Sequence, residues 1–204
     1  TKGFNTLSIL PLYHIFALTC CLLWGIRNGL NNHLVPNPRD LKSLVAAFRN
    51  SGCTGFAGLN TLFVALCNDA DFRAVDFSRL KLTMSGGMAL TMAAAGRWKE
   101  VTGVEIVEGY GMSETSPVIS VNPVNANRLG TIGIAVPSTE VRIVDDNGNE
   151  VAAGEPGELV VRGPQVMLGY WNQPGETAKV LSPDGWLHTG DVAVVTPEGY
   201  LKIV

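Results

Sequence analysis

The sequence has few charged residues and no run of basic ones. Only 16% of its 204 residues are charged, and lysines and arginines are scattered singly along the chain. Nucleic-acid and membrane-surface sites are built from clustered Lys and Arg, so this scatter argues against a nucleic-acid partner. The formal net charge of -3 adds little to that argument.

Cysteines are also few, and they form no metal or redox motif. Cys20, Cys21, Cys53 and Cys67 include one adjacent pair, and no spacing among them matches a zinc site or a redox-active pair. We therefore expect buried thiols in a reducing cytoplasm.

The sequence lacks a signal peptide and an uninterrupted membrane span. Its first residues, T-K-G-F-N-T, contain neither an initiator methionine nor a charged region followed by an apolar stretch. Pro11, Tyr13 and His14 interrupt the apolar residues from 7 to 26 and leave only 15–26 unbroken. That run spans about 18 Å as a helix, against a hydrocarbon core of about 30 Å. We predict a buried helix there.

Apolar residues are plentiful. They make up 46% of the chain, which is typical of a globular protein with a large interior. A domain of about 150 residues already buries roughly 70% of the surface of its unfolded chain. The sequence therefore suffices for one large domain or two small ones.

Short strands alternate with helices in the first part of the sequence. Apolar runs predict strands at 6–10, 54–56, 80–84 and 105–108. Helical periodicity predicts helices at 60–67 and 91–101, and another that Asn37 caps and Gly52 ends. This alternation predicts a parallel or mixed sheet covered on both faces.

After Pro123 the pattern changes to short strands separated by turns, without a helical period. Strands are predicted at 139–144, 157–162 and 200–204, with a hairpin-type turn at 145–148. Such spacing suits a small antiparallel barrel or curled sheet. We predict an α/β fold: a mixed sheet layered with helices at 1–125, then a small distorted antiparallel β-barrel subdomain at 126–204.

The central motif, V-E-G-Y-G-M-S-E-T-S-P, occupies residues 107–117, where an apolar strand ends in glycines. Gly109 and Gly111 would let the backbone pass close to a ligand, and Tyr110 between them offers a ring face to a base. These features favour a nucleotide site. The same stretch also fits a glycine-rich turn followed by a polar cap.

One acid follows those glycines, between two hydroxyls. Ser113 and Thr115 flank Glu114. Mg²⁺ takes few protein carboxylates and leaves its other positions to water and phosphate oxygens. Glu114 is therefore a candidate magnesium ligand.

Three further stretches are candidates, each with a structural alternative. His14 follows a predicted strand and either lines a substrate pocket or hydrogen-bonds within a turn. Ser85-Gly86-Gly87 precedes a helix, whose free backbone N–H groups could meet an anion or a flat base. Asp191, in G-W-L-H-T-G-D, either binds a ribose diol or closes a loop as an Asx-turn.

An ordered set of motifs accompanies these candidates. They are L-P-L-Y-H at 10–14, S-G-G at 85–87, E-G-Y-G-M-S-E-T at 108–115, G-E-L at 157–159, G-Y-W-N at 169–172, G-W-L-H-T-G-D at 185–191 and G-Y-L-K-I at 199–203. In this order they resemble the acyl-adenylate-forming family, which includes acyl-CoA synthetases, luciferases and nonribosomal adenylation domains. The resemblance is closest to bacterial-type long-chain fatty acid CoA ligases, with N-T-L-F at 60–63 and P-Q-V-M-L-G-Y-W at 164–171 contributing.

The resemblance implies a reaction and its small-molecule partners. In such enzymes a fatty acid carboxylate attacks the α-phosphate of ATP, which gives acyl-AMP and pyrophosphate. The thiol of CoA then displaces AMP to form the thioester. The implied requirements are ATP, Mg²⁺ and CoA, and the family also admits peripheral association of the full-length, cytoplasmic protein with the inner membrane. No feature predicts an oligomeric state.

The resemblance also implies roles for the candidate residues. Tyr110 would stack on adenine, Gly86 and Gly87 would pass along its other face, and Asp191 would bind both ribose hydroxyls. Base stacking on an aromatic ring contributes about 1–3 kcal/mol. The rest of the implied nucleotide site is Glu108, Gly109, Gly111 and Met112.

The implied catalytic residues are Glu114, Ser113 and His14. Ser113 stands where the family usually has threonine, so contact with the α-phosphate is kept while the rotamer restraint of a β-branch is lost. Glu114 would hold Mg²⁺, which offsets repulsion between the incoming carboxylate and the phosphates.

Two family features are missing from the sequence. The phosphate loop that normally precedes L-P-L-Y-H is not found in residues 1–30, and the catalytic lysine of the family follows the G-Y-L-K-I strand. We therefore expect an internal fragment of a larger ligase, inactive by itself. An aryl-CoA ligase, an amino-acid adenylating domain and a non-enzymatic nucleotide-binding module are the alternatives.

Overall fold

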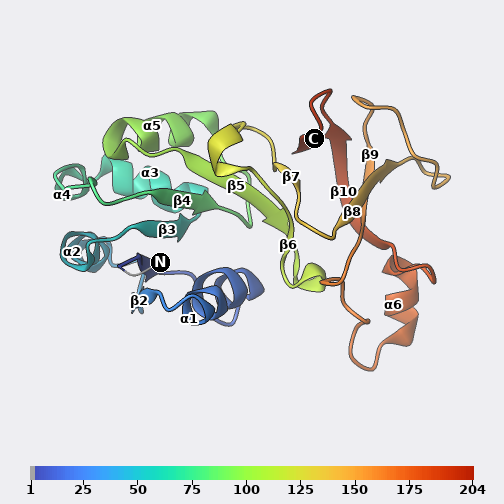
Figure 1. The fold of residues 1–204 in the computed structure, drawn as a ribbon, viewed down its shortest axis with the longest axis horizontal. Helices are drawn as coiled ribbons and strands as arrows, with labels where there is room; N and C mark the ends of the chain where they lie inside the picture. The colour runs from blue at the N-terminus through green and yellow to red at the C-terminus, as the bar shows by residue number, and fades with distance from the viewer. Residues whose placement is uncertain (1–2) are drawn as a thin grey trace. The chain divides into compact units, whose positions relative to one another are not determined.

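The computed structural model describes residues 3–204, and the contacts within it divide the chain into two units (Figure 1). The first ends at Glu108 and the second begins at Gly109. This division falls earlier in the chain than the domain boundary expected near residue 125, which stays a prediction.

The first unit contains a parallel sheet in the order β2-β1-β3-β4-β5. Its strands are β1 (Asn5–Ser8), β2 (Asn31–Leu34), β3 (Gly55–Gly58), β4 (Leu82–Ser85) and β5 (Ile106–Gly111). Four of these agree with the prediction to within a few residues. The polar strand β2, N-N-H-L, was missed because it pairs only with β1 at the edge and has no apolar run.

Helices connect these strands. They are η1, a π-helix (Ala17–Leu23), α1 (Trp24–Arg27), α2 (Leu41–Ser51), α3 (Asn60–Asn68), α4 (Ala70–Arg73) and α5 (Met92–Thr102). The helix capped by Asn37 was wrong at its start, because the Asp40 carboxylate accepts the N–H of Ser43 and begins α2 instead. Gly52 ends α2, as predicted, and it does so in the left-handed conformation.

The predicted buried helix at 15–26 is helical but only partly buried. Ala17 and Cys21 are buried, whereas the side chains of Leu23 and Ile26 are exposed. One side of the segment packs on β1. The apolar run at 15–26 therefore does not mean that every face of the helix is buried. Throughout residues 3–204, every helix falls short of the length and apolarity that crossing a bilayer would require.

Aromatic side chains fill the core on one face of the parallel sheet. Phe56 of β3 stacks on Trp98 of α5, Phe63 of α3 meets the same indole edge-on, and Phe72 of α4 lies beside it. The indole Nε1 of Trp98 donates to the buried hydroxyl of Thr83, 3.1 Å away. Aromatic pairs of this kind each add about 0.5–1.5 kcal/mol beyond their buried area.

The second unit consists of antiparallel strands. The end of β5 pairs with β6 (Val118–Val121), which pairs with β7 (Ile134–Ala135). A second sheet has the order β11-β10-β9-β8, formed by β8 (Glu140–Val144), β9 (Gly157–Arg162), β10 (Leu187–Val195) and β11 (Leu201–Ile203). Short helices η2 (Ser113–Thr115), η3 (Val124–Ala126) and α6 (Pro174–Val180) complete it. The predicted fold class, a mixed sheet with helices followed by a curled antiparallel sheet, is confirmed.

Two local expectations for this unit were wrong. Helix α6 was missed although it has Pro174 in its first turn, Glu176 near its start and Lys179 near its end. The segment 185–191, expected to be a loop, largely belongs to β10. Gly185 does close a turn before the strand, where its N–H donates to the carbonyl of Ser182, whereas Gly190 lies within the strand at an irregularity of its pairing with β9.

Candidate nucleotide site

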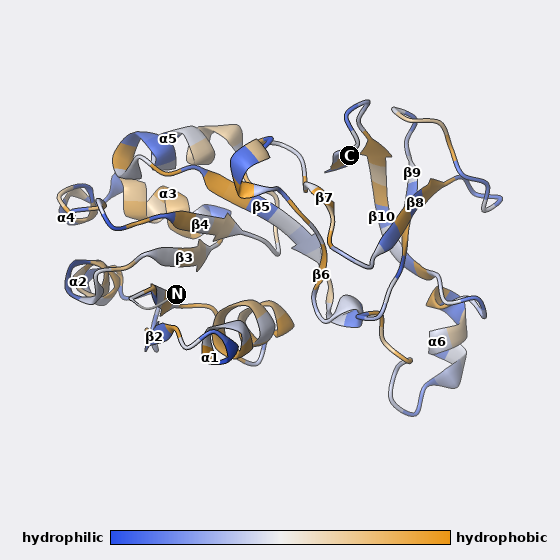
Figure 2. Cartoon of the chain, viewed as in Figure 1, coloured by the Kyte–Doolittle hydropathy of each residue, from blue (hydrophilic) through white to orange (hydrophobic). Residues whose placement is uncertain are grey.

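The glycines of the central motif lie within a strand, whereas the sequence predicted that the strand ends there. Tyr110 is paired with Ser120 of β6, and Figure 2 shows β5 losing its hydrophobic colour as it reaches these residues. A Cβ atom at Gly111 would lie 1.8 Å from the carbonyl oxygen of Pro117. Glycine is therefore required at 111 by the close approach of the chain itself.

Helix η2 follows this strand and contains Glu114, the candidate magnesium ligand. Thr115 is fully buried: its hydroxyl oxygen accepts the N–H of Met112 at 3.2 Å and donates to the carbonyl of Pro117 at 2.6 Å. This hydroxyl therefore holds the turn. Ser113 remains exposed and Glu114 half-buried, so these two side chains are the ones that a ligand can reach.

Glu114 is held from a segment that sequence reasoning left without a role. The hydroxyl of Tyr170 donates to Glu114 Oε1 at 2.8 Å, and the N–H of Met167 donates to the Glu114 carbonyl at 2.8 Å. The hydrogen bond to Glu114 raises the pKa of Tyr170. The signal for Tyr170 in the sequence was its place in the overlapping motifs P-Q-V-M-L-G-Y-W and G-Y-W-N.

Asp191 lies in a bulge of β10. His188 pairs with Val160 and Val192 pairs with Glu158, so Thr189, Gly190 and Asp191 together face the single residue Leu159. Gly190 has a φ of 75°, which favours glycine and turns the chain outward. The bulge delivers a half-buried carboxylate at Asp191.

Tyr110 and Asp191 meet in the second unit. The hydroxyl of Tyr110 donates to Asp191 Oδ2, and the ring packs against the buried clusters around Leu159 and Val161. Burial and this hydrogen bond raise the pKa of Tyr110, with a smaller contribution from the charge of Glu114. The structure therefore brings two predicted site residues, Tyr110 and Asp191, into contact, and Glu114 lies four positions after Tyr110 in the chain.

Four of the other predicted residues, His14, Gly86, Gly87 and Glu108, lie in the first unit. His14 is an exposed turn residue whose Nδ1 accepts the N–H of Phe16 at 3.2 Å, and its catalytic role stays a prediction. The glycines after β4 do not adjoin a helix start, because Thr91 caps α5 five residues after Gly86. Gly87 has a φ of 79°, and Glu108 is paired with Ser85 across the sheet.

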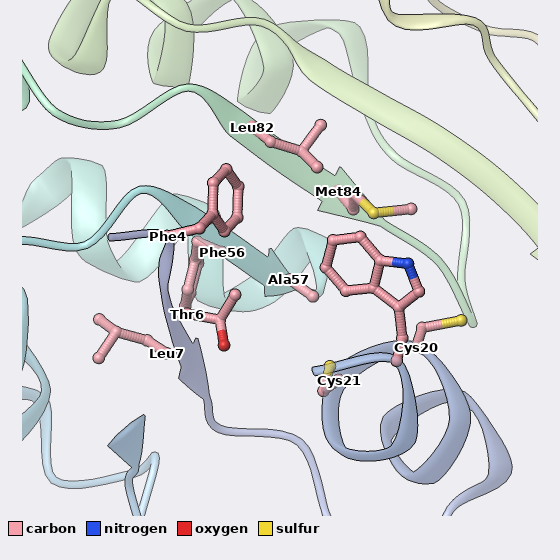
Figure 3. Close-up of a pocket in the computed structure, with 11 residues that line it drawn as sticks. Phe4, Thr6, Leu7, Cys20, Cys21, Phe56, Ala57, Leu82 and Met84 are labelled. Atoms are coloured by element: carbon pink, nitrogen blue, oxygen red, sulfur yellow. The ribbon is translucent and has the colours of Figure 1, made fainter. Parts of the chain in front are cut away.

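The first unit also contains a small apolar pocket of about 40 Å³ (Figure 3). Cys20 and Cys21 of η1 line it together with Ala57 of β3 and Leu82 and Met84 of β4. Side chains alternate along β4, so Thr83 between the last two points to the opposite, aromatic face. The pocket therefore lies between η1 and the sheet.

These features and the fold define a class of protein. A family model described as AMP-binding enzyme matches residues 1–171. The chain belongs to the AMP-binding enzyme family.

Two curated relatives illustrate the likeness within this family. The chain is 50% identical to the long-chain-fatty-acid–CoA ligase of Escherichia coli O157:H7 over 198 residues, which are 97% of the chain and 35% of that ligase. It is 35% identical to the feruloyl-CoA synthase of an Amycolatopsis species over 95% of the chain and 39% of that enzyme. The chain thus spans little more than a third of the length of these relatives.

A solved structure matches the fold closely. The crystal structure of the anthranilate CoA ligase AuaEII in complex with anthranoyl-AMP aligns with a TM-score of 0.92 and 28% identity. The alignment covers 99% of this chain and 39% of the ligase.

Proposed function

We propose that the chain forms the acyl-adenylate-binding part of an ATP-dependent long-chain fatty acid CoA ligase. In the first step a fatty acid carboxylate oxygen bonds to the α-phosphorus of ATP and pyrophosphate leaves. In the second, the sulfur of CoA bonds to the acyl carbon, AMP leaves and the thiol proton is released. The carrying observation is the contact between Tyr110 and Asp191 in a chain that is 50% identical to such a ligase.

The nucleoside is held by the tyrosine and the bulge. Asp191 accepts hydrogen bonds from the ribose hydroxyls, each worth about 1.5–3 kcal/mol for a charged acceptor. Tyr110 offers its ring to adenine. The acyl-adenylate held by the anthranilate ligase in its crystal supports a site for this kind of molecule.

The phosphates meet Ser113 and Glu114, with the backbone of Gly109, Gly111 and Met112 beside them. Within residues 3–204, no group of three or more His, Cys, Asp or Glu side chains could hold a metal ion. A single half-buried carboxylate nevertheless fits Mg²⁺, which is usually bound through one or two carboxylates, waters and substrate phosphates. When bound, Mg²⁺ would offset the negative charge of the phosphates.

A long-chain fatty acid is the preferred substrate class, and an aryl acid is the second. The identity to the long-chain ligase exceeds that to the feruloyl-CoA synthase. Thioester formation by the full-length protein that carries this chain, compared across fatty acids, aryl acids and amino acids, separates these candidates. Nucleotide binding without turnover on any acid would favour a non-enzymatic module.

Two substitutions in that full-length protein test the site. Asp191→Ala is expected to raise the KM for ATP roughly 10- to 100-fold, because it removes charged hydrogen bonds. Glu114→Ala is expected to depress ATP–pyrophosphate exchange through loss of metal placement. Glu150→Ala, which removes an exposed carboxylate 3.8 Å from Arg142, is the control and should leave exchange unchanged. Wild-type exchange by the Glu114 variant at ordinary Mg²⁺ would remove that residue from the mechanism.

The full-length protein is proposed to work in the cytoplasm, with peripheral association at the inner membrane. Cell fractionation of the tagged full-length protein checks this: the ligase should be recovered in cytosolic and salt-releasable membrane fractions. Recovery only with integral membrane proteins would contradict the proposal.

A further inference from the structure

The G-E-L motif at 157–159 lies on β9, directly beside the bulge of β10 that carries Asp191. Three residues of β10 bulge out opposite the single residue Leu159. A bulge leaves backbone groups outside the regular ladder, and these groups need other partners. The residues that supply those partners decide where Asp191 points.

Glu158 supplies partners at two points of the bulge. Its Oε1 accepts the N–H of Gly190 at 3.0 Å, and its Oε2 lies 2.8 Å from His188 Nδ1. His188 is the last paired residue before the bulge, and Gly190 is the residue that turns the chain. The Glu158 carboxylate on β9 thus contacts both the residue before the bulge of β10 and the glycine within it.

Thr189 completes the arrangement. Its hydroxyl donates to the carbonyl of Leu159 at 2.7 Å and accepts the N–H of Asp191 at 3.1 Å. Each residue of the bulge is therefore bonded either to β9 or to a neighbour within the bulge. The carboxylate of Asp191 remains directed at the hydroxyl of Tyr110.

We propose that Glu158 is a positioning residue, which holds the β10 bulge so that Asp191 meets the ribose diol. A charged acceptor for the Gly190 N–H is stronger than a neutral one, which suits a bulge whose glycine would otherwise sample many conformations. The inference rests on the proposed role of Asp191 in ribose binding.

The test compares two nucleotides on the full-length protein that carries this chain. AMP has the ribose diol, whereas 2′,3′-dideoxy-AMP lacks it, and isothermal titration measures the dissociation constant of each. Wild type should prefer AMP about tenfold or more, and Asp191→Ala should lose that preference. Glu158→Ala should lose most of the same preference while its affinity for dideoxy-AMP changes little.

Two further variants sharpen the test. Glu158→Gln keeps a neutral oxygen acceptor for the Gly190 N–H and should retain part of the preference, even if the alanine variant folds poorly. The double variant of Asp191 and Glu158 should be no worse than Asp191→Ala, because both changes act through one carboxylate. Glu140→Ala, on β8 and paired with Arg162, is the control and should preserve the preference.

The outcomes separate the two ideas. Suppose that Asp191→Ala abolishes the preference for AMP, but that Glu158→Ala lowers the affinity for both nucleotides equally or changes neither affinity. The positioning role is then overturned, and ribose binding by Asp191 stands. If Asp191→Ala itself keeps the preference for AMP, the proposed ribose contact fails, and the inference falls with it.

Discussion

At the scale of single residues, the candidate metal ligand depends on a partner far away in sequence. Tyr170 donates to Glu114 at 2.8 Å, although 56 positions separate them. Glu114 is a half-buried side chain in a short η2 turn, and without that contact its carboxylate is free to change rotamer. Partners that orient a metal ligand typically change metal affinity or activity 10- to 100-fold when removed.

Tyr170→Phe therefore has a specific expected effect in the full-length protein. It removes only the hydroxyl, and we expect the Mg²⁺ concentration for half-maximal ATP–pyrophosphate exchange to rise roughly 3- to 10-fold. This is less than the typical effect, because Tyr170 is partly exposed. Excess Mg²⁺ should restore the rate. Tyr200→Phe is the matched control, because that hydroxyl donates to the Ala126 carbonyl at 2.7 Å, away from Glu114. Identical Mg²⁺ curves for wild type and the Tyr170 variant would contradict the expectation.

Burial also determines the reactivity of the four cysteine thiols. Cys21, Cys53 and Cys67 are buried, as expected, whereas Cys20 is only partly so. Burial raises the pKa of the Cys53 thiol to about 12 and that of Cys20 to about 11. Thiolate is the reactive form, so these side chains are poor nucleophiles at neutral pH.

At the scale of elements, the close pairing of β5 with the chain around Pro117 decides the shape of the central motif. Gly111 has no room for a side chain, because a Cβ atom there would overlap the backbone of Pro117. The partner is backbone, so the contact cannot be relieved by a rotamer change.

Gly111→Ala should consequently destabilise the second unit by about 2–3 kcal/mol, the upper part of the usual range for single substitutions. Urea unfolding of the 204-residue chain measures this. Gly96→Ala is the matched control: Gly96 lies inside α5 with nothing within 4 Å of the position that an alanine methyl would occupy, so alanine should stabilise by about 0.5–1 kcal/mol. Equal midpoints for the Gly111 variant and wild type would show that the two segments separate readily.

At the scale of the whole molecule, the chain spans 35% of the ligase with which it shares 50% identity. Electrostatic groups that act together on the reacting phosphates usually supply the largest share of catalysis. Under the proposed function, the described residues would contribute only a metal carboxylate and a nucleoside site to that set.

We therefore expect the 204-residue chain alone to form no acyl-CoA. Purified chain is incubated with ATP, Mg²⁺, a long-chain fatty acid and CoA, and AMP and acyl-CoA are measured beside the full-length protein. Adenine nucleotide binding by the chain should be weak, because the triphosphate has few partners. Turnover comparable to the full-length protein would show that residues 1–204 contain a complete active site.

Local sequence was enough to determine the fold class and most elements of this protein. Apolar runs and helix caps act over a few residues, so β9, α3 and the helix end at Gly52 could be predicted. The ordered motifs indicated the AMP-binding family, which the comparison confirmed.

The tertiary structure alone decided how the site is held. The strand at Gly109–Gly111, the bulge before Asp191 and the contacts of Tyr170 and Glu158 depend on pairing between segments distant in sequence. A glycine in the sequence signals conformational freedom, but it does not say whether a ligand or another strand uses the space. Only the folded chain brings Glu158 to Gly190 and Tyr170 to Glu114, because those contacts form when separate strands and turns pack together.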